Sequence, residues 1–248
     1  MSSRFKIRKS KLPLVLVNMA MTADGKIATA NRAVSSFGSA RDRAHLFELR
    51  ATVDAVMAGA RTVNSAPINL GPGPVRFRRL RLRRGLTEYN LRVIVSGSGL
   101  VNPQAEIFRQ RFSPVIVFTT RRATAARLRQ LRVVADAVKV FGKRKINFRA
   151  ALQWLHEQWG VKRLLCEGGG ELNAALFRAG LVDELHLTVC PMIFGGREAP
   201  TIADGSGIRR LTQATQLRFG SFKHIGNEIF AVFTRTGNRS NQRDIHNP

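Results

Sequence analysis

The sequence predicts an α/β fold in which a mostly parallel central sheet has helices on both faces and ends in an antiparallel hairpin. Short apolar runs alternate along the chain with amphipathic segments, as they do in βαβ units. Several of these runs are apolar at nearly every position, which is typical of strands that are buried on both faces of a parallel sheet. The last two runs instead flank Gly226-Asn227, a turn pair that favours a β-hairpin.

A single domain is expected, because the 248 residues are 44% hydrophobic and no long Pro-, Gly- or Ser-rich linker divides them. We place this domain at residues 13–236, between a basic N-terminal tail at 1–12 and a polar C-terminal tail at 237–248 that is predicted to be disordered. No apolar run reaches the roughly 18 residues that cross a bilayer, so a soluble protein is expected. The only cysteines, Cys166 and Cys190, lie inside apolar runs, which predicts reduced thiols in a cytoplasmic protein.

The first half of the chain is predicted to contain one helix and four strands. The helix is expected from about Ala40 to Ala51, because Ser39 and Asp42 have the spacing of a capping box and apolar residues recur on one face. The strands are mostly apolar and short enough to lie buried in a sheet. They are Leu14–Met19, Ala55–Ala58, Leu91–Val95 and Val115–Thr119.

The second half continues the alternation. Phe148–Trp159 has apolar residues at helical spacing and is followed by Gly160, a typical helix terminator. Ala123–Arg132 has similar spacing, and another helix is expected from Glu171 to about Ala179. The strands of this half are marked by apolar or alternating residues and are Val138–Phe141, Arg163–Glu167, Glu184–Val189, Leu217–His224 and Glu228–Thr234.

The charge of the chain is strongly positive, with 41 Lys and Arg against 16 Asp and Glu, a net charge of +25. Such a field attracts polyanions in general. The densest run follows the Gly/Pro-rich segment Gly71–Pro74 and has few aromatic residues for stacking on bases, so a solvated basic loop is predicted there. The alternatives are that the run attracts phosphorylated ligands to the protein, or that it is a nucleic-acid surface. Nucleic acid is not the expected partner. The run contains Arg76, Arg78, Arg79, Arg81, Arg83 and Arg84.

Small or polar residues stand where the apolar strands end, at Ala20, Thr62, Ser96 and Thr119. Because ligands of open α/β sheets bind at the carboxyl ends of the strands, these positions predict a lined cleft. A further strand ends in the glycine turn Gly168–Gly170 and continues as a helix. Backbone N–H groups in such a turn can approach a phosphate closely, with the positive end of the helix dipole behind them.

Several kinds of catalytic site are excluded by inspection. The sequence has no HExxH, GxSxG, Walker or zinc-deaminase motif, and its histidines lack metal-ligand spacing, so no metal site is expected. As a dinucleotide motif the glycine turn is weak, because Asn173 stands where a third glycine would be. The many arginines, without an acidic residue about 20 positions beyond the first strand, favour a 2′-phosphorylated cofactor over NAD.

Three segments together resemble the riboflavin-biosynthesis pyrimidine reductases, which in many bacteria form the C-terminal domain of a bifunctional deaminase/reductase. They are VNMAMTADGKIA, GARTV and CEGGGELNAALFRAGLVDELHLTVCPMIFGG, and the terminal hairpin follows them. The resemblance covers roughly Pro13 to Thr234 and implies a dihydrofolate reductase-like fold, a homodimer and NADPH as cofactor. The implied reaction reduces a ribosylamino to a ribitylamino group. Its substrate would be 5-amino-6-(5-phosphoribosylamino)uracil or 2,5-diamino-6-ribosylamino-4(3H)-pyrimidinone 5′-phosphate.

The resemblance also implies roles for individual residues. Glu167 would contact the substrate and serve catalysis, and Arg50 would bind the substrate, in particular its phosphate. Asp24, in the D-G-[KR] turn of the family, would be mainly structural, with proton supply as the alternative. The residues expected to contact NADPH are Ala20, Thr62, Ser96, Thr119, Gly168, Gly169, Gly170, Glu171, Leu172, Asn173, Ala174 and Ala175.

One loop departs from the family pattern. Bacterial members read T-V-x-x-D-[DN]-P-x-L after the second strand, whereas Thr62–Leu70 lacks that carboxylate, which Asn64 or Ser65 could replace. This departure leaves open a reductase of the same fold for another pterin-like substrate such as dihydrofolate. A basic protein that binds RNA or membrane surfaces is the second alternative. No deaminase sequence accompanies the reductase, so a stand-alone enzyme is expected.

Overall fold

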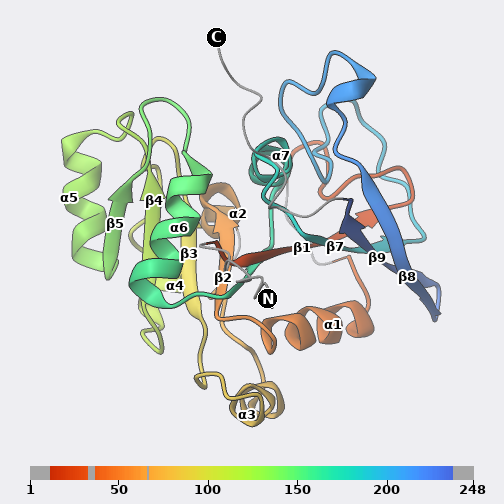
Figure 1. Cartoon of the computed structure of the whole chain (residues 1–248), viewed down its shortest axis with the longest axis horizontal. Helices are drawn as coiled ribbons and strands as arrows, with labels where there is room; N and C mark the ends of the chain where they lie inside the picture. The colour runs from red at the N-terminus through yellow and green to blue at the C-terminus, as the bar shows by residue number, and fades with distance from the viewer. Residues whose placement is uncertain (1–11, 33–36, 66, 237–248) are drawn as a thin grey trace, which may run out of the picture.

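The computed structural model describes residues 12–32, 37–65 and 67–236, which form one sheet with helices on both sides (Figure 1). The strand order is β5-β4-β3-β2-β6-β1-β7-β9-β8. Neighbouring strands from β5 to β7 are parallel, and the last two strands are antiparallel. The predicted fold class is therefore confirmed. Apart from Leu12, the two predicted tails lie outside the described residues.

The elements follow the predicted alternation closely. The strands are β1 (Leu14–Thr22), β2 (Ala55–Gly59), β3 (Leu91–Val95), β4 (Val115–Thr119), β5 (Ala137–Val140), β6 (Arg163–Cys166), β7 (Glu184–Cys190), β8 (Leu217–Ile225) and β9 (Glu228–Arg235). The helices are α1 (Ala40–Arg50), α2 (Ala60–Ser65), α3 (Val75–Arg83), α4 (Glu106–Arg109), α5 (Ala125–Val134), α6 (Phe148–Trp159) and α7 (Gly170–Arg178), with a 3₁₀ turn at Leu211–Gln213.

Local signals explain where these elements begin and end. The Ser39 side chain accepts hydrogen bonds from the backbone N–H groups of Arg41 and Asp42, so it caps α1 as predicted. Gly160 ends α6 in the left-handed conformation, with φ +65°. Gly226, with φ +61°, provides the turn between β8 and β9.

Two apolar layers cover the two faces of the sheet, because successive strand residues point to opposite sides. Val15 and Val17 of β1 belong to the layer that includes α6 and α7, whereas Leu16 belongs to the layer that includes α1, α2, α4 and α5. In Figure 1, α7 and α1 accordingly lie on opposite sides of β1. β6 lies between β1 and β2, so the turn that follows it is near the centre of the sheet.

The prediction of a solvated basic loop at Val75–Gly85 is wrong, since most of this run forms helix α3. Phe77 and Arg81, about one turn apart, are buried and give the helix an inward face. The Arg81 guanidinium donates hydrogen bonds to the carbonyls of Arg50 and Val53, both at 2.6 Å, and of Thr87 at 2.9 Å. Arginine is also a good helix former, so a run of arginines suits a helix with one polar face.

Candidate functional site

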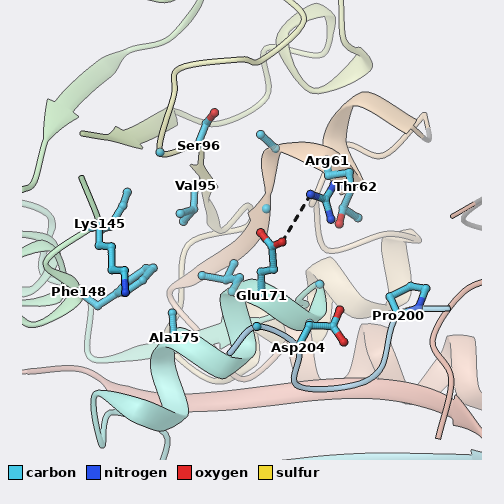
Figure 2. A pocket seen from close by; sticks show the side chains of 18 of the residues that line it. Arg61, Thr62, Val95, Ser96, Lys145, Phe148, Glu171, Ala175, Pro200 and Asp204 are labelled. Carbon is cyan, nitrogen blue, oxygen red and sulfur yellow. Dashed lines mark ion pairs between the residues drawn. The ribbon is translucent and has the colours of Figure 1, made fainter. Parts of the chain in front are cut away.

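A cavity of about 1220 Å³ opens at the carboxyl ends of β2, β3 and β6. Its walls come from the start of α2, the turn after β3, the residues around the start of α6, the first turns of α7 and a loop at residues 200–206. Figure 2 shows part of this lining, with α7 along one side. The cavity is large enough for an extended ligand such as a dinucleotide.

The structure brings many of the predicted site residues to this cavity. Those in its lining are Thr62, Ser96, Glu167, Gly169, Gly170, Glu171, Leu172 and Ala175. Ala20, Asp24, Arg50, Thr119, Gly168, Asn173 and Ala174 are outside it. Thr119 is fully buried at the end of β4, which lies beyond β3 in the sheet. Asn173 is buried behind the turn, where its side-chain amide donates to the Ile202 carbonyl at 2.9 Å.

The three positions of the glycine turn Gly168–Gly170 favour glycine for different reasons. Gly168 has φ +75°, and a Cβ atom there would lie 2.7 Å from the Met19 sulfur. Gly170 packs against the Thr201 carbonyl and Asp204, which leaves no room for a side chain. Gly169 faces the cavity, and a Cβ atom at this position would meet only Ile27, at 4.0 Å. The turn therefore leaves open space beside the first N–H groups of α7, which have no partner within the helix. This cradle suits a pyrophosphate.

Glu167 is held by Arg50 in a bidentate ion pair. Arg50 Nε and Nη2 each donate to one Glu167 carboxylate oxygen at 2.6 Å, and Nη1 donates to the Gly71 carbonyl at 2.6 Å. The two side chains are only 9% and 11% exposed. Arg50, predicted to bind the substrate phosphate, thus stands behind Glu167 and fixes the direction of its carboxylate at the cavity wall.

Asp24 lies outside the cavity lining, and its side chain is held by three hydrogen bonds. Its carboxylate accepts from the Thr22 hydroxyl at 2.5 Å and from the backbone N–H groups of Phe194 and Gly195 at 3.2 and 2.7 Å. The Thr22 bond, followed by those from Gly195 and Phe194, holds the pKa of Asp24 below its usual value. A carboxyl group with a lowered pKa is a poor proton donor, so this geometry favours the structural role over proton supply.

The loop that departs from the family pattern begins as helix α2. Asn64 and Ser65 both line the cavity. The Asn64 side chain joins α2 to the turn after β3, since its oxygen accepts from the Asn102 N–H at 2.9 Å. The Ser65 hydroxyl donates to the Arg61 carbonyl at 2.7 Å. Each of these two side chains therefore lines the cavity and also makes a hydrogen bond to the protein backbone.

Sequence reasoning missed one wall of the cavity and the arginine at its charged mouth. Lys145 comes from the segment between β5 and α6, and Phe148 is the first residue of α6; this part of the sequence carries no binding motif. Arg61 and Glu171 form an ion pair of 3.7 Å at the exposed mouth, drawn as a dashed line in Figure 2. The described residues include no cluster of three or more His, Cys, Asp or Glu side chains arranged for a metal ion. In the same part of the chain no helix combines the length and the apolarity needed to cross a membrane.

Comparisons with known proteins show what the chain is similar to. The family model described as the RibD C-terminal domain matches residues 13–231. A curated protein of Methanothermobacter thermautotrophicus is 33% identical over 225 residues, which cover 91% of this chain and 99% of the relative. A protein of Archaeoglobus fulgidus is 34% identical over 223 residues, covering 90% of this chain and 98% of the relative. Both relatives are named 2,5-diamino-6-ribosylamino-4(3H)-pyrimidinone 5′-phosphate reductase.

Solved structures with the same fold include two that span most of this chain. A pyrimidine reductase-like protein of Corynebacterium diphtheriae superimposes with a TM-score of 0.75 at 24% identity, covering 91% of this chain and 93% of the other. RibD of Acinetobacter baumannii superimposes with a TM-score of 0.71 at 20% identity, covering 92% of this chain and 59% of the other. At these identities the structures show a shared fold.

Proposed function

Because the chain belongs to the RibD C-terminal domain family, we propose that it is an NADPH-dependent reductase of riboflavin biosynthesis. The proposed substrate is 2,5-diamino-6-ribosylamino-4(3H)-pyrimidinone 5′-phosphate, whose ribosylamino group becomes a ribitylamino group. The observation that carries this proposal is the match, over nearly their whole length, to two relatives named for that reaction. Both relatives are named for the diamino substrate, so it is proposed in preference to the deaminated one.

The reaction needs little chemistry from the protein side chains. Opening of the ribose ring gives an imine at C1′, and the nicotinamide cofactor supplies the hydride that reduces it. The protein has to hold the two reactants together and stabilise positive charge on the imine. Glu167 is suited to this second task, because Arg50 orients its carboxylate at the cavity wall next to the glycine turn.

The residues present suit a dinucleotide. Gly169 and the first N–H groups of α7 would hold the pyrophosphate, and the hydroxyl groups of Thr62 and Ser96 lie in the same cavity. Met19 of β1, which directly precedes Ala20, lines the cavity, and its sulfur lies beside Gly168, the residue after Glu167, so the reacting end of the cofactor is assigned to this side. Substrate and cofactor would meet at Glu167.

A homodimer in the cytoplasm completes the proposal. Strand β8 is at the edge of the sheet and has two exposed aromatic side chains, Phe219 and Phe222, at 55% and 62%. A second copy of the chain would cover such an edge, which otherwise presents unpaired backbone groups. The two cysteines are free and buried, in keeping with a reducing compartment.

Oxidation of NADPH in the presence of candidate substrates tests the proposed function. The diamino pyrimidine phosphate should support the fastest turnover, the deaminated uracil analogue slower turnover, and dihydrofolate none. Product identity should be checked by mass spectrometry for a gain of two hydrogens. An enzyme that oxidises NADPH with neither pyrimidine would contradict the proposal.

A further inference from the structure

The orientation of a dinucleotide in the cavity follows from two fixed points. In the proposed function the substrate is reduced beside Glu167, directly after β6, and the first turn of α7 holds the pyrophosphate. In the sheet β6 is followed by β2 and then β3, on the side away from β1. The adenosine half of the cofactor is therefore assigned to the end of the cavity formed by the turn after β3.

That end of the cavity has two facing walls. One wall is the turn after β3, with Val95, Ser96 and Ser98, and the other is the segment before and at the start of α6, with Lys145 and Phe148. Figure 2 shows Lys145, Phe148, Val95 and Ser96 gathered at one side of the pocket, away from Asp204 and Pro200. Apolar side chains here suit an adenine, and the hydroxyl and ammonium groups suit a charged ribose substituent.

The charged side chains at the end of the cavity between the turn after β3 and the start of α6 are all positive. The acidic residues of the described lining are Glu167, Glu171 and Asp204, and all of them belong to the β6–α7 segment or the loop at 200–206. The turn after β3 and the segment from Lys145 to Arg149 contribute Lys145 and Arg149, with no carboxylate in the described lining. Enzymes that use NAD commonly place a carboxylate on the ribose 2′-hydroxyl, whereas a cation accommodates a 2′-phosphate.

The backbone around Lys145 is tightly held. The Asn147 N–H donates to the Phe141 carbonyl at 3.1 Å, and the Arg121 N–H donates to the Gly142 carbonyl at 3.1 Å. Asn147 then caps α6 through its side chain, which accepts from the Ala150 N–H at 3.1 Å. A lysine on such a fixed segment loses less freedom when it binds an anion than one on a mobile loop.

From these observations we infer that Lys145 determines the specificity for the cofactor. Its ammonium group binds the adenosine 2′-phosphate of NADPH, which NADH lacks, and the enzyme therefore prefers NADPH. This role rests on the proposed function. The Ser96 and Ser98 hydroxyl groups lie on the opposite wall, within the same cavity. Lys143 is a matched control, since it is exposed on the same segment and is not part of the cavity lining.

Binding of nucleotide fragments that cannot react tests this role directly. Isothermal titration calorimetry would compare 2′,5′-ADP with 5′-ADP on the wild-type chain, Lys145→Ala and Lys143→Ala. Lys145→Ala should weaken 2′,5′-ADP roughly tenfold, as expected for one charge-assisted hydrogen bond, and leave 5′-ADP unchanged. Lys143→Ala should change neither. Equal weakening of both nucleotides, no change in Lys145→Ala, or the same loss in Lys143→Ala would overturn the inference.

The steady-state preference for NADPH over NADH separates this inference from the proposed function. In Lys145→Ala the ratio of the two kcat/KM values should fall roughly tenfold, mainly through a higher KM for NADPH. A wild-type chain that binds 2′,5′-ADP through Lys145 but does not reduce the pyrimidine would contradict the proposed function alone. A chain that reduces the pyrimidine with an unchanged cofactor preference in Lys145→Ala would contradict the inference alone.

Discussion

At the scale of single residues, the direction of the Glu167 carboxylate depends on Arg50. Replacement of Glu167 with Gln keeps the shape but puts an amide NH₂ group against a guanidinium that is only 9% exposed. We expect kcat with the pyrimidine to fall on the order of 100-fold, because stabilisation of the imine charge is lost. The Kd of NADPH, measured by calorimetry, should change by less than about twofold, because the residues assigned to its pyrophosphate and adenosine are other ones.

Glu157→Gln is the control for this variant. Glu157 is exposed on α6, where it accepts a hydrogen bond from Gln153, and its replacement should leave turnover and folding unchanged. A Glu167→Gln enzyme that binds NADPH poorly but turns over normally once saturated would mean that Glu167 serves the cofactor.

Arg50→Lys distinguishes a positioning residue from one that binds the substrate phosphate. Lysine keeps the charge but cannot make the two parallel hydrogen bonds that hold Glu167. We expect kcat to fall roughly tenfold with the phosphorylated substrate and by the same factor with its dephosphorylated analogue. The double variant with Glu167→Gln should be little worse than Glu167→Gln alone. A defect confined to the phosphorylated substrate would instead support phosphate binding by Arg50.

The raised pKa of Asp42 predicts that the stability of the folded protein depends on pH. Burial, assisted by the negative charge of Glu228, raises the pKa of Asp42 above its usual value of 3.8. The folded state therefore favours the protonated carboxyl group, and stability is lost as the pH rises from about that value through the raised pKa. Asp42→Asn should have a higher Tm than the wild type at neutral pH, and the difference should shrink as the pH falls toward 3.8. A difference that is constant with pH would show that the ionisation of Asp42 is not its cause.

At the scale of elements, α3 depends on one buried cation. Burial lowers the pKa of Arg81 to about 10, and its guanidinium joins α3 to the end of α1 and to the segment before β2. Arg81→Ala leaves three carbonyl groups without this donor, those of Arg50 and Val53 in a buried position, so we expect a loss of about 2–4 kcal/mol in urea unfolding. Arg83→Ala, at an exposed position of the same helix, should cost less than about 0.5 kcal/mol. Similar losses in both variants would contradict this role.

The sequence predicted most elements because apolar periodicity follows burial closely in this fold. Leu91–Val95, Val115–Thr119 and Phe148–Trp159 have the predicted bounds. β1 continues beyond Met19 to Thr22 because Ala20, Met21 and Thr22 pair with β7, a long-range contact that periodicity does not report. α3 was missed because Arg81 occupies a buried position that a hydrophobic pattern assigns to an apolar residue.

The candidate site was predictable only where sequence neighbours are also neighbours in space. The glycine turn and Glu167 adjoin each other in the chain, so they were found together. Thr119 was proposed because every strand end looked alike, and only the strand order places β4 beyond β3. Lys145 reaches the cavity through the packing of α6 on the sheet, which no local motif records. The Arg50–Glu167 ion pair joins residues 117 positions apart.

At the scale of the whole molecule, part of the excess positive charge is structural. Arg50, Arg81 and Arg92 are buried, and Arg92 donates to the Ile107 carbonyl at 2.7 Å. The rest of the net charge of +25 should produce weak, sequence-independent binding of RNA. In fluorescence anisotropy this binding should fall on the order of 10³-fold between about 50 mM and about 200 mM salt. RNA affinity that survives high salt, in a chain that does not bind NADPH, would favour the RNA-binding alternative.

The central position of β6 also sets the order in which the chain can fold as it is synthesised. β1 and β2 are not neighbours in the sheet, since each pairs with β6, which begins only at Arg163. A nascent chain that stops before that point holds two apolar strands without the strand that joins them. Contacts between residues this far apart in the sequence form slowly. Until they form, the unpaired strands expose surface that is prone to aggregation. Glu167 follows β6 directly, so the stretch of chain that joins β1 to β2 in the sheet also delivers the candidate catalytic carboxylate.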